Sequence, residues 1–339
     1  MIREKETGGQ KMQMLKVHGS NNDFFILDEK NLENSITEDE LVTLAKKVCD
    51  RKNGLHGGAD GILYVTAGHA GVAGRMRVIN ADGSEASMCG NGIRTVARYL
   101  SEQKELDEFK IETMHADLEV KRAADFAPNV QAFDAEISPV SFAAADLGMH
   151  IEGKTELIDD YIPQLSDTLK FSAVSVPNPH LIAFVSHDVL VGPELGRIAS
   201  YLNNGENPIF PDGVNVSFVE IQKAKQIFVR TYERGVGYTN ACGTAMSASS
   251  LMYVLLYPDQ VKKNQLISVF NPGGMVKTCV HQRKNGSYWM SLIGNATFVA
   301  NVKVDQSAAF RGDFTAAVWD EKNEQDAYEK FVVQLQRGQ

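Results

Sequence analysis

"SMCGNGIRTVARYL", residues 87–100, places a cysteine between a polar turn and a run with helical spacing of its apolar side chains. The apolar positions recur at i, i+3, i+4 and i+7 from Ile93 to Leu100, the pattern of one helix face. This spacing predicts a helix over about 91–103 that begins directly after Cys89.

A second stretch repeats this arrangement. "TNACGTAMSA", residues 239–248, again sets a Cys-Gly step, at Cys242, before a helix-like run. That run, 243–257, is apolar or small on nearly every side, and Pro258 ends it. A helix without a polar face is expected to be buried on all sides. The recurrence suggests an internal duplication of strand, polar turn, cysteine and central helix.

The rest of the chain reads as short β-like runs separated by turn residues, with few helices, which favours an antiparallel α+β fold over a doubly wound sheet. Strands are predicted at 24–28, 61–65, 75–79, 110–114, 181–185, 214–221, 227–233 and 288–294, and helices at 37–50, 91–103, 193–203, 243–257 and 320–336.

The length of 339 residues favours two domains. We place the boundary near 136, where "DAEISPVSF" reads as a link, and expect "NATFVANVKV" at 295–304 to return to the first domain. The prediction is an extension or disordered segment at 1–13, an N-terminal domain with Cys89, and a C-terminal domain with Cys242. The N-terminal domain comprises 14–136 plus about 296–339, and the C-terminal domain comprises 137–295.

Composition limits the function classes. A hydrophobic content of 43% and a charged content of 23% are typical of a soluble globular protein. The net charge of −9 disfavours nucleic acid as a partner. The apolar stretch 251–257 is too short to span a membrane, and the polar N-terminus lacks the apolar core of a secretory signal. Four widely spaced cysteines without a Cys-x-x-Cys pair argue against a zinc ribbon or a thioredoxin-type site, and we expect free thiols in a reducing cytoplasm.

A single buried cysteine is most often a small hydrophobic residue, and Cys49 and Cys279 fit that description. Cys89 and Cys242 fit it less well, because unpaired N–H groups at a helix start lower a thiol pKa towards neutrality. Such a thiolate is a candidate nucleophile, metal ligand or base. Two equivalent thiols on opposite sides of one carbon would invert a stereocentre, one removing a proton and the other returning one. Helix-start amides could then hold a carboxylate, namely those of Gly90, Asn91, Gly243 and Thr244.

Several polar residues stand at the edges of apolar strands. Each alone is compatible with an ordinary loop. Together they form a set of carboxamides, one acid and one arginine that could hold an amino group and a carboxylate at a second, non-reacting centre. The set is Asn22, Asn80, Asn178, Asn215, Glu233 and Arg234, with His180 beside Asn178 in "NPH".

The motifs "HGSNNDF", "GGADG", "NADGSEASMCGNGIR", "NPH", "GVNVSFVE", "YERGVGYTNACGT" and "GNATFV" occur in this order. Over about residues 14–304 the chain therefore resembles the diaminopimelate epimerase family. The resemblance implies two similar domains, each an antiparallel barrel-like sheet around a central helix, with the active site in the cleft between them. It implies epimerisation of LL- to meso-diaminopimelate for lysine and cell-wall supply, with no pyridoxal phosphate, other cofactor or metal, and a possible homodimer.

The resemblance also implies residue roles. Cys89 and Cys242 form the acid/base pair, and His180 and Glu233 support proton transfer or orient the reacting centre. The distal L-centre is bound by Asn22, Asn80, Asn178, Asn215, Glu233 and Arg234, and the reacting carboxylate by the amides of Gly90, Asn91, Gly243 and Thr244.

The chain departs from the family pattern at Asn21, Tyr238 and Ala245, and the segment 140–175 and the tail beyond 304 are longer than usual. Two other functions stay open at this point. One is a racemase of the same fold that acts on another amino acid. The other is a non-catalytic amino-acid binding protein or thiol-redox sensor.

Overall fold

The computed structural model describes residues 11–32 and 34–337. By its internal contacts the chain forms two compact units. Within the described ranges, the first unit comprises 11–32, 34–133 and Asn295–Phe331, and the second comprises Asp134–Gly294 and 332–337.

The elements up to residue 137 are β1 (Lys11–Gly19), β2 (Asn22–Asp28), η1 (Glu29–Asn31), α1 (Glu38–Val48), η2 (Leu55–Gly57), β3 (Gly61–Thr66), β4 (Gly74–Asn80), β5 (Glu85–Ala86), α2 (Gly90–Lys104), β6 (Glu108–Glu112), β7 (Asp117–Ala127) and β8 (Val130–Ile137). From residue 138 they are η3 (Ala144–Leu147), β9 (Asp160–Tyr161), β10 (Lys170–Ser175), β11 (Pro179–Phe184), α3 (His187–Val191), α4 (Glu194–Leu202), β12 (Asn215–Lys223), β13 (Gln226–Glu233), β14 (Gly237–Thr239), α5 (Gly243–Leu256), β15 (Leu266–Asn271), β16 (Gly274–Gln282), β17 (Tyr288–Asn295), β18 (Thr297–Asp305), α6 (Gln306–Arg311), β19 (Val318–Glu321) and α7 (Glu324–Arg337).

The two units repeat one topology. In the first, β1–β2, β3–β4, β4–β5 and β6–β7 pair antiparallel, while β2–β3 and β4–β6 pair parallel. In the second, β10–β11, β12–β13, β13–β14 and β15–β16 pair antiparallel, while β11–β12 and β13–β15 pair parallel. The order and sense of the pairs match one for one, which confirms the predicted duplication.

The parallel pairs correct one expectation, since the sheets are mixed and not wholly antiparallel. Each parallel pair is joined through a segment that contains a helix, such as α1 between β2 and β3 or α2 between β4 and β6. A parallel connection needs such a crossover, whereas a tight turn suffices for an antiparallel one.

Each unit places its cysteine helix against the strands. Helix α2 contacts β1, β2, β3, β4 and β7, and α5 contacts β10, β11, β12, β13, β15 and β16. Every residue of α5 from Gly243 to Val254 is buried, as its uniform apolar composition predicted. The sheet of each unit therefore wraps its central helix, in agreement with the expected α+β class.

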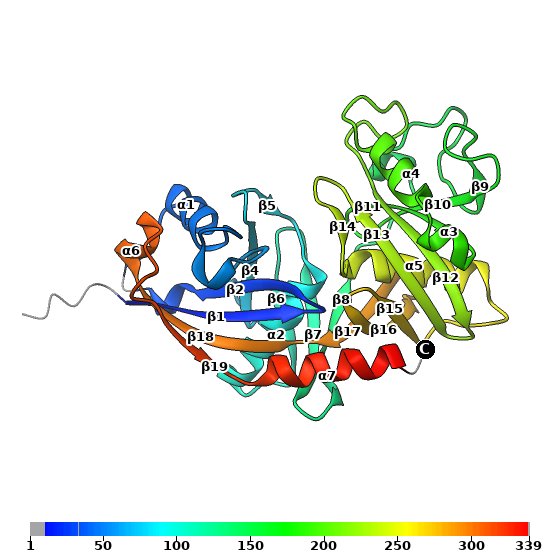
Figure 1. Cartoon of the computed structure of the whole chain (residues 1–339). Coiled ribbons are helices and arrows are strands. Elements are labelled where there is room, and N and C mark those ends of the chain that lie inside the picture. The colour runs from blue at the N-terminus through cyan, green and yellow to red at the C-terminus, as the bar shows by residue number, and fades with distance from the viewer. Residues whose placement is uncertain (1–10, 33, 338–339) are drawn as a thin grey trace, which may run out of the picture. The chain divides into compact units, whose positions relative to one another are not determined.

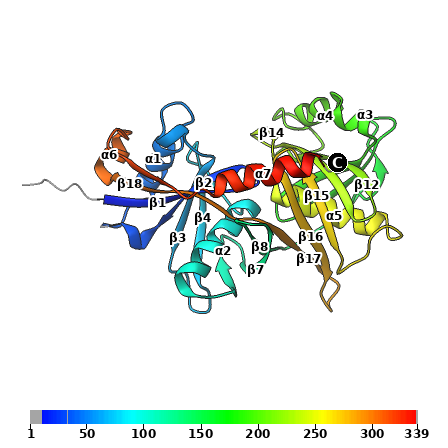
Figure 2. The same cartoon turned by 60° about the horizontal axis from the view of Figure 1, so that its bottom comes forward.

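Strand β18, far along the chain, pairs antiparallel with β1. Figure 1 shows β1, β2 and β18 side by side, and Figure 2 shows β16 beside β17 in the second unit. Residues 11–13, assigned from sequence to the extension, belong to β1, because Met12 is fully buried opposite Val304. Residues 1–10 lie outside the described part of the chain.

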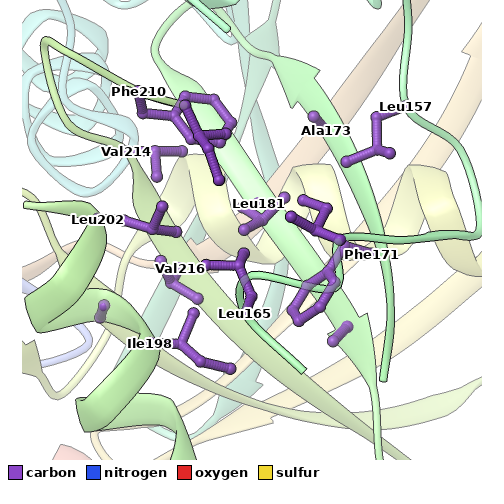
Figure 3. Packing of buried hydrophobic residues seen from close by; sticks show 14 of the residues in the cluster. Leu157, Leu165, Phe171, Ala173, Leu181, Ile198, Leu202, Phe210, Val214 and Val216 are labelled. Carbon is purple, nitrogen blue, oxygen red and sulfur yellow. The ribbon is translucent and has the colours of Figure 1, made fainter. Parts of the chain in front are cut away.

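Each unit has its own hydrophobic core. In the second, Ile198 and Leu202 of α4 pack towards Leu181 of β11 and Val216 of β12 (Figure 3). In the first, the apolar face of α1 packs with side chains of β1, β2, β3 and β18. These cores hold the strands whose ends carry the candidate site residues.

Among the described residues, no helix combines the length and hydrophobicity that crossing a lipid bilayer requires.

Candidate functional site

Cys89 is the N-cap residue of α2, with the extended backbone angles φ −137° and ψ 111°. Its Sγ accepts a hydrogen bond from the backbone N–H of Gly92 at 3.3 Å. A side chain at position 92 would place its Cβ 2.8 Å from Cδ2 of the buried Leu63, so glycine lets the helix start pack against β3. The thiol is thereby fixed at the positive end of the helix.

Asn22, at the start of β2, connects Cys89 to the first turn of α2. Its Oδ1 accepts from Asn91 Nδ2 at 3.1 Å and faces Cys89 Sγ at 3.7 Å. The β1–β2 turn approaches α2 closely, since a Cβ at Gly19 would lie 2.9 Å from Arg94 Nη2 and 3.0 Å from the Asn91 carbonyl oxygen. The structure thus brings three predicted site residues into one bonded group.

A network of charged residues behind Asn22 was not predicted from the sequence. Asp60 Oδ2 accepts from Asn22 Nδ2 at 2.5 Å, and Arg51 bridges Asp60 and Asp23 at 2.6 and 2.5 Å. The buried Lys16 pairs with Asp23 at 2.5 Å. Burial lowers the pKa of Lys16, while Asp23 acts in the opposite direction. The sequence feature that could have indicated this network is the acidic Asp60 within the glycine-rich "HGGADG", which lies before a buried strand.

Asn80 ends β4, as predicted, and belongs to the turn that leads to Cys89. Its Nδ2 donates to Ser84 Oγ at 3.0 Å, and Asp82 Oδ1 accepts from the Ser84 backbone N–H at 2.9 Å. These contacts hold Asn80 within the turn that precedes Cys89.

In the second unit, Thr244 connects two predicted residues through its side chain. Its Oγ1 lies 3.0 Å from His180 Nε2 and 3.5 Å from Cys242 Sγ. His180 Nε2 also lies 3.1 Å from Asn178 Oδ1. From the sequence only the backbone amide of Thr244 was considered, so this use of its hydroxyl is new.

The sequence predicted a lowered thiol pKa at both helix starts, and for Cys242 this is wrong. Burial raises the pKa of the Cys242 thiol well above its usual value, and the nearby carboxylate of Glu233 raises it further. The hydroxyl of Thr244 opposes these effects without outweighing them. Cys242 is only 7% exposed, so desolvation of the thiolate outweighs the helix start.

His180 is fully buried in β11. Burial lowers the pKa of its imidazole to about 3, and the positive charge of Arg234 acts in the same direction. The ring is therefore neutral near pH 7. Because Nε2 of the neutral ring contacts both Asn178 Oδ1 and Thr244 Oγ1, the imidazole is suited to holding these two side chains in place.

Asn215 and Arg234 form a second bonded group in this unit. Asn215 lies opposite His180 in the parallel β11–β12 pair, and its Oδ1 accepts from the Arg234 backbone N–H at 2.8 Å. The Arg234 guanidinium donates to the Asp212 carbonyl at 2.8 Å. This arrangement holds the end of β13, where Glu233 lies.

The predicted residues therefore form two half-sites, one in each unit. The first half-site contains Asn22, Asn80, Cys89, Gly90 and Asn91, and the second contains Asn178, His180, Asn215, Glu233, Arg234, Cys242, Gly243 and Thr244. Each offers a thiol at the start of a buried helix, chemistry suited to taking up or releasing a proton. Within the described ranges, no group of three or more His, Cys, Asp or Glu could hold a metal ion.

Known proteins resemble this chain over most of its length. The family profile described as "Diaminopimelate epimerase" matches residues 14–134 and 172–299. A diaminopimelate epimerase of Ligilactobacillus salivarius (strain UCC118) is 73% identical, covering 96% of this chain and 100% of that protein. One of Lactiplantibacillus plantarum (strain ATCC BAA-793 / NCIMB 8826 / WCFS1) is 58% identical, covering 96% and 99%.

Solved structures share the fold at low identity. A Bacillus anthracis phenazine biosynthesis protein of the PhzF family superposes with a TM-score of 0.62 at 16% identity, covering 87% of this chain and 99% of that one. A hydroxyproline epimerase from Agrobacterium vitis superposes with a TM-score of 0.56 at 13% identity, covering 87% and 91%. These likenesses concern the fold alone.

Proposed function

Because this chain belongs to the diaminopimelate epimerase family, we propose that it interconverts LL- and meso-diaminopimelate, with Cys89 and Cys242 as the two bases and without a cofactor. The observation that carries the proposal is the 73% identity to a named epimerase over 96% of the chain. The duplicated half-sites support it, since each unit contributes one thiol at an equivalent helix start.

In the proposed reaction one sulfur, as thiolate, removes the α-hydrogen as a proton and becomes a thiol. The electron pair stays on the α-carbon, and the other thiol then gives its proton to the opposite face and becomes a thiolate. The stereocentre is inverted and the two sulfurs exchange protonation states. The raised pKa of Cys242 supports its role as proton donor in the direction in which Cys89 is the base.

Binding at the reacting centre is assigned to the first turns of α2 and α5. In an α-helix the first N–H groups lack an intrahelical acceptor and favour an anion. We assign the reacting carboxylate to the amides of Gly90, Asn91, Gly243 and Thr244. The same field would stabilise the negative charge that develops when the α-proton leaves.

The second, non-reacting centre is assigned to Asn22, Asn80, Asn178, Asn215, Glu233 and Arg234. An amino acid with one centre would leave this set without a ligand, at a cost of about 1–3 kcal/mol for a buried group such as Asn215 and less for the partly or fully exposed others. This cost favours diaminopimelate over a smaller amino acid.

Proton exchange in heavy water tests the substrate assignment. Diaminopimelate and a panel of other amino acids would be incubated with the protein, and deuterium at the α-carbon followed by mass spectrometry. We expect exchange and epimerisation with diaminopimelate. Faster exchange with another amino acid would identify a racemase of the same fold with a different substrate.

Single cysteine variants test the two-base chemistry. We expect Cys89→Ala and Cys242→Ala each to lower kcat by at least about 10²–10⁴-fold, the usual contribution of a positioned acid or base. The buried Cys49→Ala is the matched control and should retain turnover. Full activity in either site variant would rule out the assignment of that thiol, and retained ligand affinity without any turnover in the unaltered protein would indicate a binding protein.

We further propose a homodimer in the cytoplasm. The four cysteines are free thiols, and the proposed chemistry requires two of them in reduced form. Light scattering at several protein concentrations measures the mass, and a constant monomer mass would exclude the dimer.

A further inference from the structure

We infer that Asp60 is a positioning residue for Cys89: its carboxylate fixes the Asn22 amide so that Oδ1, and not Nδ2, faces the thiol. The inference rests on the proposed role of Cys89 as an acid/base group. It concerns residues outside the predicted site, since Asp60 and Arg94 had no assigned role.

The hydrogen-bond chemistry of four residues fixes the orientation. The side chains of Asn22 and Asn91 lie in a row between two charged residues. At one end Asn22 Nδ2 donates to Asp60 at 2.5 Å. At the other end Arg94 Nη2 donates to Asn91 Oδ1 at 3.1 Å. A carboxylate has only acceptors and a guanidinium has only donors. The carboxylate therefore requires an N–H group from Asn22, and the guanidinium requires the oxygen of Asn91. With these orientations Asn91 Nδ2 donates to Asn22 Oδ1 at 3.1 Å, so the two amides are compatible with each other.

Asp60 is itself held in place. Its Oδ1 accepts from Arg51 at 2.6 Å, and its Oδ2 also accepts from the Asp23 backbone N–H at 3.1 Å. Its backbone N–H donates to the Asp23 carbonyl, and its own carbonyl accepts from Ala81, both at 2.9 Å. The acceptor presented to Asn22 is thus fixed from both the side chain and the main chain.

At the far end of the row, Arg94 is fully buried within α2. Its Nη1 donates to the Gly90 carbonyl at 2.9 Å. The same guanidinium therefore supports both the helix start and the Asn91 amide. Neither amide of the row can turn over without losing a bond to one of the charged ends.

The orientation affects the protonation of Cys89. Asn22 Oδ1, 3.7 Å from Sγ, accepts from the S–H of the thiol form, whereas the Gly92 N–H favours the thiolate. A reversed amide would present N–H groups to the sulfur and favour the thiolate further. The charged groups behind these amides are Asp60, Asp23, Arg51 and Lys16 on one side and Arg94 on the other. With the observed orientation, Cys89 can retain a proton that it has removed.

Site-resolved alkylation tests the inference without any turnover. Iodoacetamide labelling of Cys89 would be followed by peptide mass spectrometry from pH 5 to pH 10, which gives the pH midpoint of thiolate formation. We expect Asp60→Asn to lower this midpoint by about half to one pH unit, because the Asn22 amide becomes free to turn over. Asp107→Asn, the same change at an exposed position of the same unit, should leave it unchanged.

The Asn22→Ala background separates positioning from a direct effect of charge. If Asp60 acts through Asn22, adding Asp60→Asn to the Asn22→Ala variant should not shift the alkylation midpoint of Cys89 any further. An equal shift with and without Asn22, or no shift in Asp60→Asn alone, would overturn the inference. Should Asp60→Asn lack a cooperative thermal transition, Asp60→Ser replaces it in both backgrounds, with the same expected and contrary outcomes. A separate epimerisation assay of the unaltered protein keeps failure of the proposed function distinct from failure of this inference.

Discussion

Thr244 connects His180 to Cys242 within the second half-site. Its hydroxyl lies within hydrogen-bond distance of both the imidazole and the sulfur, and all three side chains are buried. Burial and Glu233 raise the pKa of the Cys242 thiol, and the Thr244 hydroxyl opposes them together with the backbone N–H of Ala245. The surroundings of Cys242 therefore affect the pKa of its thiol more than its position at the start of α5 does.

We expect Thr244→Val to lower kcat about 2- to 10-fold, because it removes a hydrogen bond of about 0.5–1.5 kcal/mol while keeping the side-chain shape. Thr244→Ser keeps the hydroxyl and should restore most of the loss. Steady-state kinetics of both variants measures the effect. Equal activity of Thr244→Val and the unaltered protein would show that the hydroxyl has no role in turnover.

The buried His180 makes stability depend on pH. Its pKa is about 3 in the folded state against about 6.5 when unfolded, so only the unfolded chain gains this proton between those values. The contribution of the neutral His180 to the free energy of unfolding is fully present above about pH 6.5 and decreases as the pH falls towards 3. The contribution lost between pH 7 and pH 5 is about 2 kcal/mol.

Urea unfolding at pH 7 and pH 5 measures this dependence. In His180→Gln the free energy of unfolding should change between pH 7 and pH 5 by about 2 kcal/mol less than in the unaltered protein. His18, whose pKa is lowered to about 4 by burial, contributes in the same direction and remains in the variant. An unchanged pH dependence in His180→Gln would show that His180 does not titrate in this way.

At the scale of elements, α7 anchors α2. Arg98 of α2 forms a two-bond ion pair with Glu324 at 2.5 and 2.8 Å and lies 3.8 Å above the Phe298 ring. Glu324 also accepts from the Phe298 backbone N–H at 3.0 Å. The tail beyond residue 304 thus contributes directly to the packing of the helix that carries Cys89.

We expect Glu324→Ala to destabilise the protein by about 3 kcal/mol, because it leaves a buried arginine without its main carboxylate. Glu102→Ala is the matched control, since Glu102 also pairs with Arg98 but its side chain is 43% exposed. That variant should cost about 0–1 kcal/mol. Chemical unfolding compares the two, and equal effects would contradict the assigned importance of α7.

At the scale of the whole molecule, the repeated topology gives each unit one cysteine at an equivalent place. The proposed chemistry requires both sulfurs to reach one carbon, so we expect them to form a disulfide when the substrate is absent. We expect diamide to inactivate the enzyme by oxidising both thiols to one disulfide, with the hydrogen atoms passing to the diamide, and dithiothreitol to restore activity.

Peptide mass spectrometry would locate the bond between Cys89 and Cys242. In Cys89→Ser the disulfide should not form, whereas Cys279→Ser should behave as the unaltered protein does. Full activity in a sample with the disulfide confirmed would contradict the two-thiol mechanism.

Much of the fold was predictable from the sequence, because apolar spacing within one segment depends on that segment alone. The helices α1, α2, α4, α5 and α7 and the burial of α5 were all predicted, whereas the pairing of β18 with β1 was not. Strands β1 and β7 were not predicted, although Lys11–Met14 and Asp117–Val120 each alternate polar and apolar residues. The parallel pairs depend on which strands meet across a crossover, and local spacing does not contain that information.

The sequence by itself determined the family, the duplicated helix starts and the two cysteines, because these are local motifs in a fixed order. Only the tertiary structure decided the protonation of Cys242, the role of the Thr244 hydroxyl and the row from Asp60 to Arg94. Desolvation and hydrogen bonding depend on residues that are distant along the chain, and folding alone brings those residues together.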